Sequence, residues 1–301
     1  PRYRLIRGDV CDRCLLDTIL RLDDGCMDAI VHFAAETHVD RSIEDSSPFI
    51  RTNVLGTQVL LEAARSAWEA RTSSRTDRNP IPRFLHVSTD EVYGPSSAAQ
   101  SFSETSSLRP TSPYAASKAS ADLLCQSYAQ TYGVPVVIAR LSNQYGPNQL
   151  PEKLIPKAIT SLMTSQPIPI YGRGQQRRCW LYVDDACRAL EQLLSRGVDP
   201  GVYNIPGLSE RRNIDLIEDV IQVFDQLSSE DAPDPTANPR LRFVRDPRGP
   251  AHDAGYRMDG GKIAAVIGGI SPTSIEEGLR QTISWYLAHP DWICRATRRL
   301  V

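Results

Sequence analysis

Short apolar runs alternate with longer mixed segments along the first half of this chain. The runs are rich in β-branched and aromatic residues, which is typical of strands buried in a parallel sheet. The segments between them have the length and composition of helices. The predicted strands are 3–10, 28–35, 84–88 and 134–141, and the predicted helices are 13–22, 48–70 and 114–132. This alternation predicts an α/β fold with a doubly wound, Rossmann-type parallel sheet.

The second half of the chain has a less regular pattern, with many prolines, glycines and short apolar runs. Helices are expected at 214–227 and 274–286, and a short strand at 202–205. The segments 71–82 and 228–239 are rich in Ser, Asp, Arg and Pro, so we expect exposed loops there.

Composition narrows the class of protein but does not identify it. The 301 residues are 41% hydrophobic and 23% charged, with a formal net charge of −2, which is ordinary for a globular protein and gives no electrostatic reason to expect nucleic acid. No apolar run reaches the roughly 18 residues of a membrane span. Seven scattered cysteines favour a reduced, cytoplasmic setting. Cys11 and Cys14 form a Cys-x-x-Cys, but no second pair follows, and we expect no metal site.

The best candidate chemistry follows the run Phe84–Ser88. Thr89, Asp90 and Glu91 come directly after this predicted strand. Ligands of open α/β sheets bind beyond the carboxyl ends of the strands, so a hydroxyl and two carboxyl groups are expected at the site. Tyr93 is expected to pack rather than to catalyse.

A second candidate pair lies on the predicted helix 114–132. Tyr114 and Lys118 are four residues apart, so they share one face of the helix. An ammonium group beside a phenol favours the phenolate, and we therefore expect Lys118 to lower the pKa of Tyr114 and make it a usable base for a hydroxyl proton.

Tyr-x-x-x-Lys together with Ser-Thr-Asp-Glu-Val-Tyr-Gly resembles the extended short-chain dehydrogenase/reductases, and within them the dTDP-glucose 4,6-dehydratases, over about residues 3–286. The resemblance implies NAD as cofactor and a nucleotide-diphosphate sugar as substrate. It also implies an NAD-binding domain at 1–150, a smaller substrate-binding lobe at 151–301 interleaved with it, and a homodimer formed through the helices 48–70 and 114–132.

The resemblance also assigns catalytic roles. Tyr114 is implied as the base at the sugar C4 hydroxyl, and Lys118 as the residue that lowers its pKa and holds the nicotinamide ribose. Thr89 would hydrogen-bond the C4 oxygen. Glu91 would take the C5 proton, and Asp90, with a raised pKa, would protonate the leaving hydroxyl.

Binding residues follow by the same resemblance. Implied cofactor contacts are Asp9, Val10, Phe33, Ala34, Ala35, Thr37, Thr52, Tyr114, Lys118, Asn143 and Gln144. Implied substrate contacts are Thr37, Thr89, Glu152, Lys153, Leu154, Ile170, Tyr171, Arg178, Asn204, Arg248 and His252. The chain departs from the family pattern at Gln144, where an asparagine is usual, at Cys179, where an aspartate is common, and in the stretched segment 248–253.

One expected motif does not occur. A dinucleotide-binding fold begins with a strand and a glycine-rich turn that opens a helix, and no such turn precedes Tyr3. By resemblance the chain begins at the third strand of the family's sheet, with roughly fifty residues fewer than the family and without the turn that holds the pyrophosphate. We therefore expect the chain as given to bind NAD poorly.

Three alternatives remain open at this point. UDP-glucose 4,6-dehydratases carry similar catalytic residues and differ in base recognition. Nucleotide-sugar epimerases and decarboxylases share the Tyr/Lys pair but usually lack an Asp-Glu pair after the threonine, so Asp90 argues against them. From another class, the chain could be a catalytically silent fragment or a binding subunit.

Overall fold

The computed structural model describes most of the chain. The described residues are 3–21, 27–72, 82–96, 101–228, 240–249, 255–268 and 272–298. They form two compact units, each made of interleaved segments. Unit 1 comprises Pro1–Gly94, Ser103–Arg140 and Leu190–Asn204, and unit 2 comprises Pro95–Phe102, Leu141–Ala189 and Ile205–Val301. The predicted NAD-binding domain at 1–150 and the interleaved lobe at 151–301 stay predictions.

Unit 1 contains a four-stranded sheet, which confirms the predicted α/β class. Its strands are β1 (Ala29–His32), β2 (Arg83–Thr89), β3 (Val136–Leu141) and β7 (Gly201–Ile205), in the order β1-β2-β3-β7. Strands β1 and β2 are parallel, with Ala29 opposite Arg83 and His32 opposite His86. All six residues of β3 are buried, as expected for a strand with a neighbour on each side and apolar residues on both faces.

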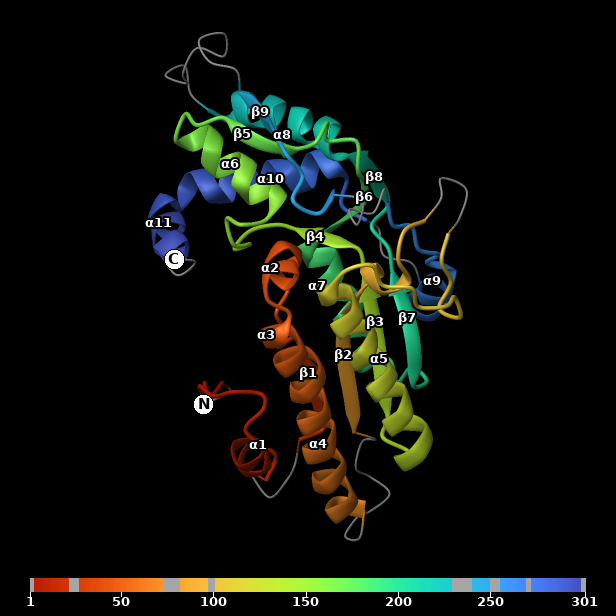
Figure 1. The fold of residues 1–301 in the computed structure, drawn as a ribbon. Coiled ribbons are helices and arrows are strands. Elements are labelled where there is room, and N and C mark those ends of the chain that lie inside the picture. Colours follow the sequence, from red (N-terminus) through yellow and green to blue (C-terminus); the bar gives the residue numbers. More distant parts are fainter. Residues whose placement is uncertain are drawn as a thin grey trace. The chain divides into compact units, whose positions relative to one another are not determined.

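The helices of unit 1 pack on this sheet. They are α1 (Arg13–Leu20), α2 (Val39–Glu44), α3 (Ser47–Phe49), the π-helix η2 (Ile50–Leu55), α4 (Gly56–Thr72), the 3₁₀-helix η3 (Asp90–Tyr93) and α5 (Pro113–Tyr132). Figure 1 shows α4 and α5 running side by side in front of the strands. Leu61, Ala64, Phe84 and Cys125 are fully buried in the apolar cluster formed by these helices and the sheet.

Side-chain caps begin two of these helices. The Asp12 side chain accepts a hydrogen bond from the Leu15 amide at 3.0 Å, which satisfies a free N–H at the start of α1. Ser112 accepts from the Ala115 amide at 3.1 Å and begins α5, with Pro113 in its first turn. The Ser112 cap therefore begins the helix that carries Tyr114 and Lys118.

Two local predictions are wrong in unit 1. The segment 3–10 forms no strand, because it pairs with no strand of the described residues, and Tyr3, Leu5 and Ile6 stay exposed. The helix predicted at 48–70 is continuous but changes geometry, since η2 inserts π-helical turns between α3 and α4. An apolar periodicity cannot register this change, because it depends on tertiary contacts of the side chains in η2.

Unit 2 has two small sheets and a set of helices. The sheets are β4 (Asn143–Tyr145), β6 (Arg177–Tyr182) and β8 (Ser209–Arg212) in the order β4-β6-β8, and the parallel pair β5 (Ile168–Tyr171) and β9 (Leu241–Val244). The helices are α6 (Leu154–Met163), α7 (Val183–Ser195), α8 (Asn213–Leu227), α9 (Gly261–Ile267), α10 (Ile275–Ala288) and α11 (Pro290–Arg298).

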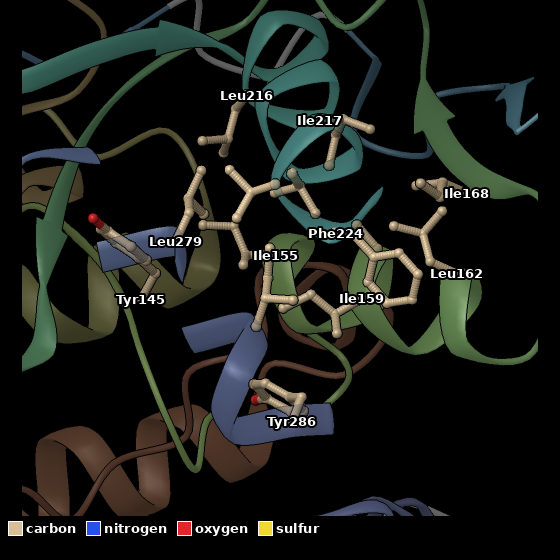
Figure 2. Packing of buried hydrophobic residues seen from close by; sticks show 14 of the residues in the cluster. Tyr145, Ile155, Ile159, Leu162, Ile168, Leu216, Ile217, Phe224, Leu279 and Tyr286 are labelled. Atoms are coloured by element: carbon tan, nitrogen blue, oxygen red, sulfur yellow. The ribbon is translucent and has the colours of Figure 1, made fainter. Parts of the chain in front are cut away.

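The core of unit 2 is apolar and lies between α6, α8, α10 and the strands. On α8, residues Leu216, Ile217, Val220, Val223 and Phe224 are buried, a spacing that places them on one helical face. Figure 2 shows this face packing against side chains from the other elements of unit 2. The labelled residues of this core are Tyr145, Ile155, Ile159, Leu162, Ile168, Leu216, Ile217, Phe224, Leu279 and Tyr286.

Two further features concern the part of the chain that the structure describes. None of its helices has the length and hydropathy required to cross a membrane. No group of three His, Cys, Asp or Glu side chains in the same residues could hold a metal ion.

Candidate active site

The turn after β2 carries the three residues that the sequence singles out. Thr89 ends the strand, and its hydroxyl accepts from the Glu91 amide and donates to Asp90 Oδ1, both at 3.3 Å. Asp90 is buried and Glu91 is half-buried. The turn closes at Gly94. Its φ of 77° favours glycine, and a Cβ atom at this position would lie only 2.2 Å from the Arg109 carbonyl oxygen, so no other residue fits. The carboxyl groups are therefore held by a short, tightly closed turn.

Helix α5 places Tyr114 and Lys118 one turn apart and buries both. The Tyr114 amide donates to the hydroxyl of Ser42 at 3.1 Å, and the ring packs edge-on against Phe49. The Lys118 ammonium donates to the Val87 carbonyl of β2 at 2.8 Å. Strand β2 and helix α5 thus bring the five predicted catalytic residues together in unit 1.

Electrostatics around Tyr114 differ from the sequence prediction. Burial raises the pKa of Tyr114 and the negative charge of Glu91 raises it further, while a hydrogen bond with Thr89 lowers it. The pKa of Tyr114 is therefore raised, and the lowering expected from Lys118 is wrong, because desolvation of the phenolate is the largest effect on this group.

Lys118 itself has a lowered pKa. Burial disfavours the ammonium, and the charge of Asp122 opposes this effect. Asp122 follows Lys118 by four residues on α5 and is fully buried. Burial would raise the pKa of Asp122, but His86 and Arg140 outweigh it, and the net pKa is lowered.

Two histidines complete the buried layer beneath Lys118. His86 of β2 lies with Nε2 3.5 Å from Asp122 Oδ1, and burial lowers its pKa to about 4. His32 of β1 lies beside it, with ring centroids 5.4 Å apart, and shares a 2.9 Å hydrogen bond with the Thr57 hydroxyl. Both imidazoles are neutral at pH 7, because burial, the largest cause, also lowers the pKa of His32.

A chain of hydrogen bonds continues from Asp122 to the turn. Arg140 of β3 donates from Nε to Asp122 at 2.8 Å and from Nη1 to the Tyr93 hydroxyl at 2.7 Å. The Tyr93 hydroxyl in turn donates to Asn204 Oδ1 at 2.7 Å. All four side chains are buried.

The predicted cofactor residues of unit 1 occupy different environments. The Asp9 carboxylate is exposed, accepts from the Cys11 amide at 2.8 Å and pairs with Arg51 at 2.9 Å. Thr52 is half-buried within η2 and Val10 is half-buried after the coil. In the turn after β1, Phe33, Ala34 and Thr37 are exposed and Ala35 is half-buried, so this stretch presents small and polar groups to a ligand.

One predicted cofactor residue of unit 2 has a buried polar atom without a partner. The amide oxygen of Asn143 accepts no hydrogen bond from the described residues. A buried polar atom without a partner costs free energy, so this oxygen is suited to a donor from a bound group. Asn143 is the residue for which the sequence predicts a nicotinamide carboxamide contact, and neighbouring Gln144 is half-buried.

The predicted substrate residues of unit 2 lie on several elements, including the start of α6 and strand β6. Lys153 precedes α6, Leu154 begins it, and Glu152 is half-buried just before them. Arg178 of β6 is buried, donates to the Arg177 carbonyl at 2.7 Å and stacks over the Tyr256 ring at 4.6 Å. Tyr171 and Arg248 are half-buried.

Three predicted substrate residues have a different outcome. Ile170 is a core residue of unit 2, with 2% of its surface exposed. Asn204 belongs to unit 1, is fully buried and is bonded to Tyr93. The assignment of these two residues as substrate contacts stays a prediction. His252 lies outside the described residues.

Sequence reasoning missed several residues that shape the site. Asp122 carries the only local signal, since Tyr114, Lys118 and Asp122 recur every four residues along α5. The roles of Arg140 and of the Tyr93 hydroxyl have no such signal in the sequence. Asn53 of η2 was also missed: its amide accepts from the Glu36 N–H at 2.8 Å and donates to the Ser117 hydroxyl at 2.8 Å. These contacts join segments that are distant in sequence.

The chain is similar in sequence to named dehydratases. The dTDP-glucose 4,6-dehydratase of Xanthomonas campestris pv. campestris is 41% identical over 288 residues, covering 96% of this chain and 80% of the relative. The Escherichia coli protein of the same name is 41% identical over 302 residues, covering 97% and 81%.

Solved structures of nucleotide-sugar enzymes are also similar to this chain. DesIV, a dTDP-glucose 4,6-dehydratase from Streptomyces venezuelae solved with NAD bound, is 40% identical with a TM-score of 0.85, covering 98% of this chain and 83% of its own. The UDP-glucuronic acid 4-epimerase of Bacillus cereus is 26% identical with a TM-score of 0.80, covering 95% and 82%. The family model described as GDP-mannose 4,6 dehydratase matches residues 1–282, and the chain belongs to this family of nucleotide-sugar dehydratases.

Proposed function

We propose that this protein dehydrates dTDP-glucose to dTDP-4-keto-6-deoxyglucose with NAD as cofactor. The observation that carries the proposal is that Thr89, Asp90 and Glu91, at the end of β2 and in η3, lie against the helix α5 of Tyr114 and Lys118, whose ammonium donates to the Val87 carbonyl of β2 at 2.8 Å. An oxidoreductase that acts on an alcohol alone requires only the Tyr/Lys pair. The adjacent acids supply the additional groups that an elimination needs.

The reaction requires four groups: a base for the C4 hydroxyl, a hydride acceptor, a base for the C5 proton and an acid for the C6 hydroxyl. The C5 proton of a hexose is not acidic, and oxidation of the C4 hydroxyl to a ketone makes it so. The protein must then remove the C5 proton and protonate the C6 hydroxyl as water leaves. Bound NAD supplies the acceptor for the C4 hydride and returns the hydride to C6.

Each protein role has a residue in unit 1. Tyr114 is the proposed base for the C4 hydroxyl proton, a role that requires the phenolate and therefore a lower pKa in the substrate complex than burial alone gives. Thr89, hydrogen-bonded to that phenol, also orients the C4 oxygen. Lys118 is a buried cation that lies one turn from Tyr114. Glu91 is half-buried and takes the C5 proton, whereas Asp90 is buried and is the better candidate for the acid, because burial favours the protonated carboxyl.

Recognition of the substrate is proposed to rest on unit 2. Arg178 is the best candidate for the diphosphate, since its guanidinium is held in place by the Arg177 carbonyl and the Tyr256 ring. Glu152, Lys153 and Leu154 at the start of α6 would contact the sugar and diphosphate. Tyr171 would flank the base, and Arg248 and His252 would complete the diphosphate site.

We further propose a homodimer in the cytoplasm. The outer surface of α5 exposes Leu123 and Tyr132, with 57% and 52% of their surfaces accessible. Large apolar side chains on a helix surface favour a protein contact. The size of the particle in solution, measured by sedimentation equilibrium, tests this part separately from activity.

The direct test is turnover of dTDP-glucose with added NAD, read as the alkali-induced absorbance of the 4-keto product. Two proteins are compared: this chain, and the same chain joined upstream to the glycine-rich strand–helix segment of a similar dehydratase. Turnover in the second protein alone supports the proposal and assigns NAD retention to that segment. Folded protein without turnover in either form, but with turnover of UDP-glucose, would reassign the substrate. No turnover of either sugar would favour a binding role.

A further inference from the structure

Tyr93 occupies an unusual place in unit 1. It is the last residue of η3, the 3₁₀-helix that begins with Asp90 and Glu91, and only 1% of its surface is exposed. The backbone of this turn is held by Gly94 N–H, which donates to the Glu91 carbonyl at 3.1 Å, and by Arg109 N–H, which donates to the Val92 carbonyl at 3.1 Å. A single 3₁₀ turn is weakly stabilised by its own hydrogen bonds, so its orientation depends on side-chain anchors.

The hydroxyl of Tyr93 is such an anchor, and both of its hydrogen-bonding functions are used. It accepts from Arg140 Nη1 at 2.7 Å and donates to Asn204 Oδ1 at 2.7 Å. The guanidinium carbon also lies 4.7 Å from the centre of the Tyr93 ring. Hydrogen bonds to a charged donor in a buried site are strong and directional.

The same arginine reaches the helix of the Tyr/Lys pair. Arg140 donates to Asp122 at 2.8 Å, and Asp122 lies one helical turn beyond Lys118 on α5. Three consecutive hydrogen bonds therefore connect α5 to β3, β3 to the turn, and the turn to β7. They join the element that holds the base for oxidation to the element that holds the acids for elimination.

Stability alone does not account for this arrangement. Burying an ion pair costs desolvation that its attraction only partly repays, and apolar replacements of similar volume are often as stable or more so. We propose that Tyr93 is a positioning residue, held between Arg140 and Asn204, that fixes the Asp90–Glu91 turn relative to the helix of Tyr114 and Lys118. This inference rests on the proposed function for the roles of the two acids.

The proposal predicts that loss of the Tyr93 hydroxyl impairs elimination more than oxidation. In Tyr93→Phe the ring remains and only the oxygen is removed. We expect kcat for dTDP-glucose to fall 10- to 100-fold, because displacement of a catalytic group by about 1 Å can cost a factor of 10², while KM changes less than about 3-fold. Because the oxidation step would persist, absorbance of reduced cofactor at 340 nm should accumulate during a single turnover.

Tyr203→Phe is the matched control. Tyr203 precedes Asn204 on β7, is buried to the same degree, and donates to the Asp199 carbonyl at 2.8 Å. This variant loses one buried hydroxyl in the same unit without touching the network. We expect its kcat and its single-turnover absorbance to match the wild type.

Two further measurements keep the test decisive. Asn204→Ala alone and with Tyr93→Phe form a double-mutant cycle, and losses in kcat that fail to add indicate one unit. Amide hydrogen exchange of residues 88–94 needs no substrate, and should rise in Tyr93→Phe but not in Tyr203→Phe. An inactive wild type would overturn the proposed function while leaving this exchange test intact. Equal kcat in the two phenylalanine variants, or unchanged exchange in the turn, would overturn the positioning role.

Discussion

The interiors of the two units differ in how many polar and charged side chains they bury, and unit 1 buries more of them. In unit 2 the core residues Leu216, Ile217, Val220, Leu279 and Ile283 are fully buried and apolar. In unit 1 an apolar cluster is accompanied by a layer of buried polar and charged side chains beneath the candidate active site. The members of this polar layer are His32, Asn53, Thr57, His86, Ser117, Lys118, Asp122, Arg140 and Asn204.

This difference between the two interiors shows that apolar burial mainly stabilises a fold, whereas buried polar groups mainly fix the positions of side chains. Apolar burial stabilises a fold without fixing any one direction, at about 25 cal/mol per Å². Buried polar groups contribute less net stability, since each must recover the cost of leaving water, but their hydrogen bonds specify distances and angles. Unit 2 therefore has the interior of a stable scaffold, and unit 1 has the interior of a site whose groups must be aligned.

The largest effect is expected at the centre of the polar layer of unit 1. Tyr114→Phe removes the base while keeping the ring that packs on Phe49. General acid–base catalysis contributes about 10²–10⁴, so we expect kcat/KM to fall by a factor of about 10³. Thermal unfolding should change little. An active Tyr114→Phe variant would remove Tyr114 from the mechanism.

The polar layer itself is tested by Arg140→Met. This change leaves Asp122 charged and buried without its main partner, which costs about 3–5 kcal/mol in unfolding free energy. The double variant Arg140→Met/Asp122→Leu should recover most of this stability, measured by urea denaturation, but not the activity. Recovery of both would mean that the charged pair has no role in alignment.

In unit 2 the expected effect is on stability alone. Leu279→Ala opens a cavity in the apolar core and should cost about 2–5 kcal/mol in the urea-unfolding free energy. Leu208→Ala, at a side chain that is 69% exposed, is the control and should stay within about 0.5 kcal/mol of the wild type. At 25 °C the folded Leu279→Ala protein should keep its kcat. A large fall in kcat would show that the two interiors are not separable in this way.

Acid should lower the free energy of unfolding by protonating histidines of the polar layer. The pKa of His86 is about 4 in the folded protein, against an ordinary value near 6.5, so between these pH values the unfolded chain binds a proton that the folded chain does not. Stability is therefore full above pH 6.5 and falls toward pH 4, by a total on the order of 3 kcal/mol from this group. His32, Lys118, Asp122 and Arg140 face this imidazole.

The measurement is the urea midpoint as a function of pH. His86→Asn should flatten the slope between pH 6.5 and 4, leaving the contribution of His32, whose pKa is also lowered. An unchanged slope in His86→Asn would show that this histidine is not the group that titrates.

The smallest effects compare two helix caps. Ser112 caps α5 in unit 1 and Ser274 caps α10 in unit 2, each accepting from a backbone amide at 3.1–3.2 Å. Alanine at either position should cost about 1 kcal/mol of unfolding free energy. Only Ser112→Ala should also lower kcat, because α5 carries Tyr114. Equal effects on kcat would argue against a special alignment of α5.

Much of the fold was predictable because short stretches of neighbouring residues determine many of its helices and strands. Runs such as Phe84–Ser88 indicate buried strands, and Asp12 and Ser112 begin helices where their side chains can accept from backbone amides. Wrong local predictions have a common cause. The segment 3–10 has the composition of a strand, but a strand requires a neighbour, and the described residues offer none. The π-helix η2 has no signature in the apolar periodicity.

The candidate site shows the same division. The sequence by itself determined which residues could do the chemistry, because Thr89, Asp90 and Glu91 follow a strand and Tyr114 and Lys118 share a helical face. Only the tertiary structure decided that the pKa of Tyr114 is raised by burial, where the sequence predicted that Lys118 would lower it.

Tertiary structure alone also assembled the network of Asp122, Arg140, Tyr93 and Asn204. Its hydrogen bonds join residues separated by 18, 47 and 111 positions. Desolvation and long-range hydrogen bonding depend on the positions of neighbours in space, and neither leaves a periodic signal along the chain.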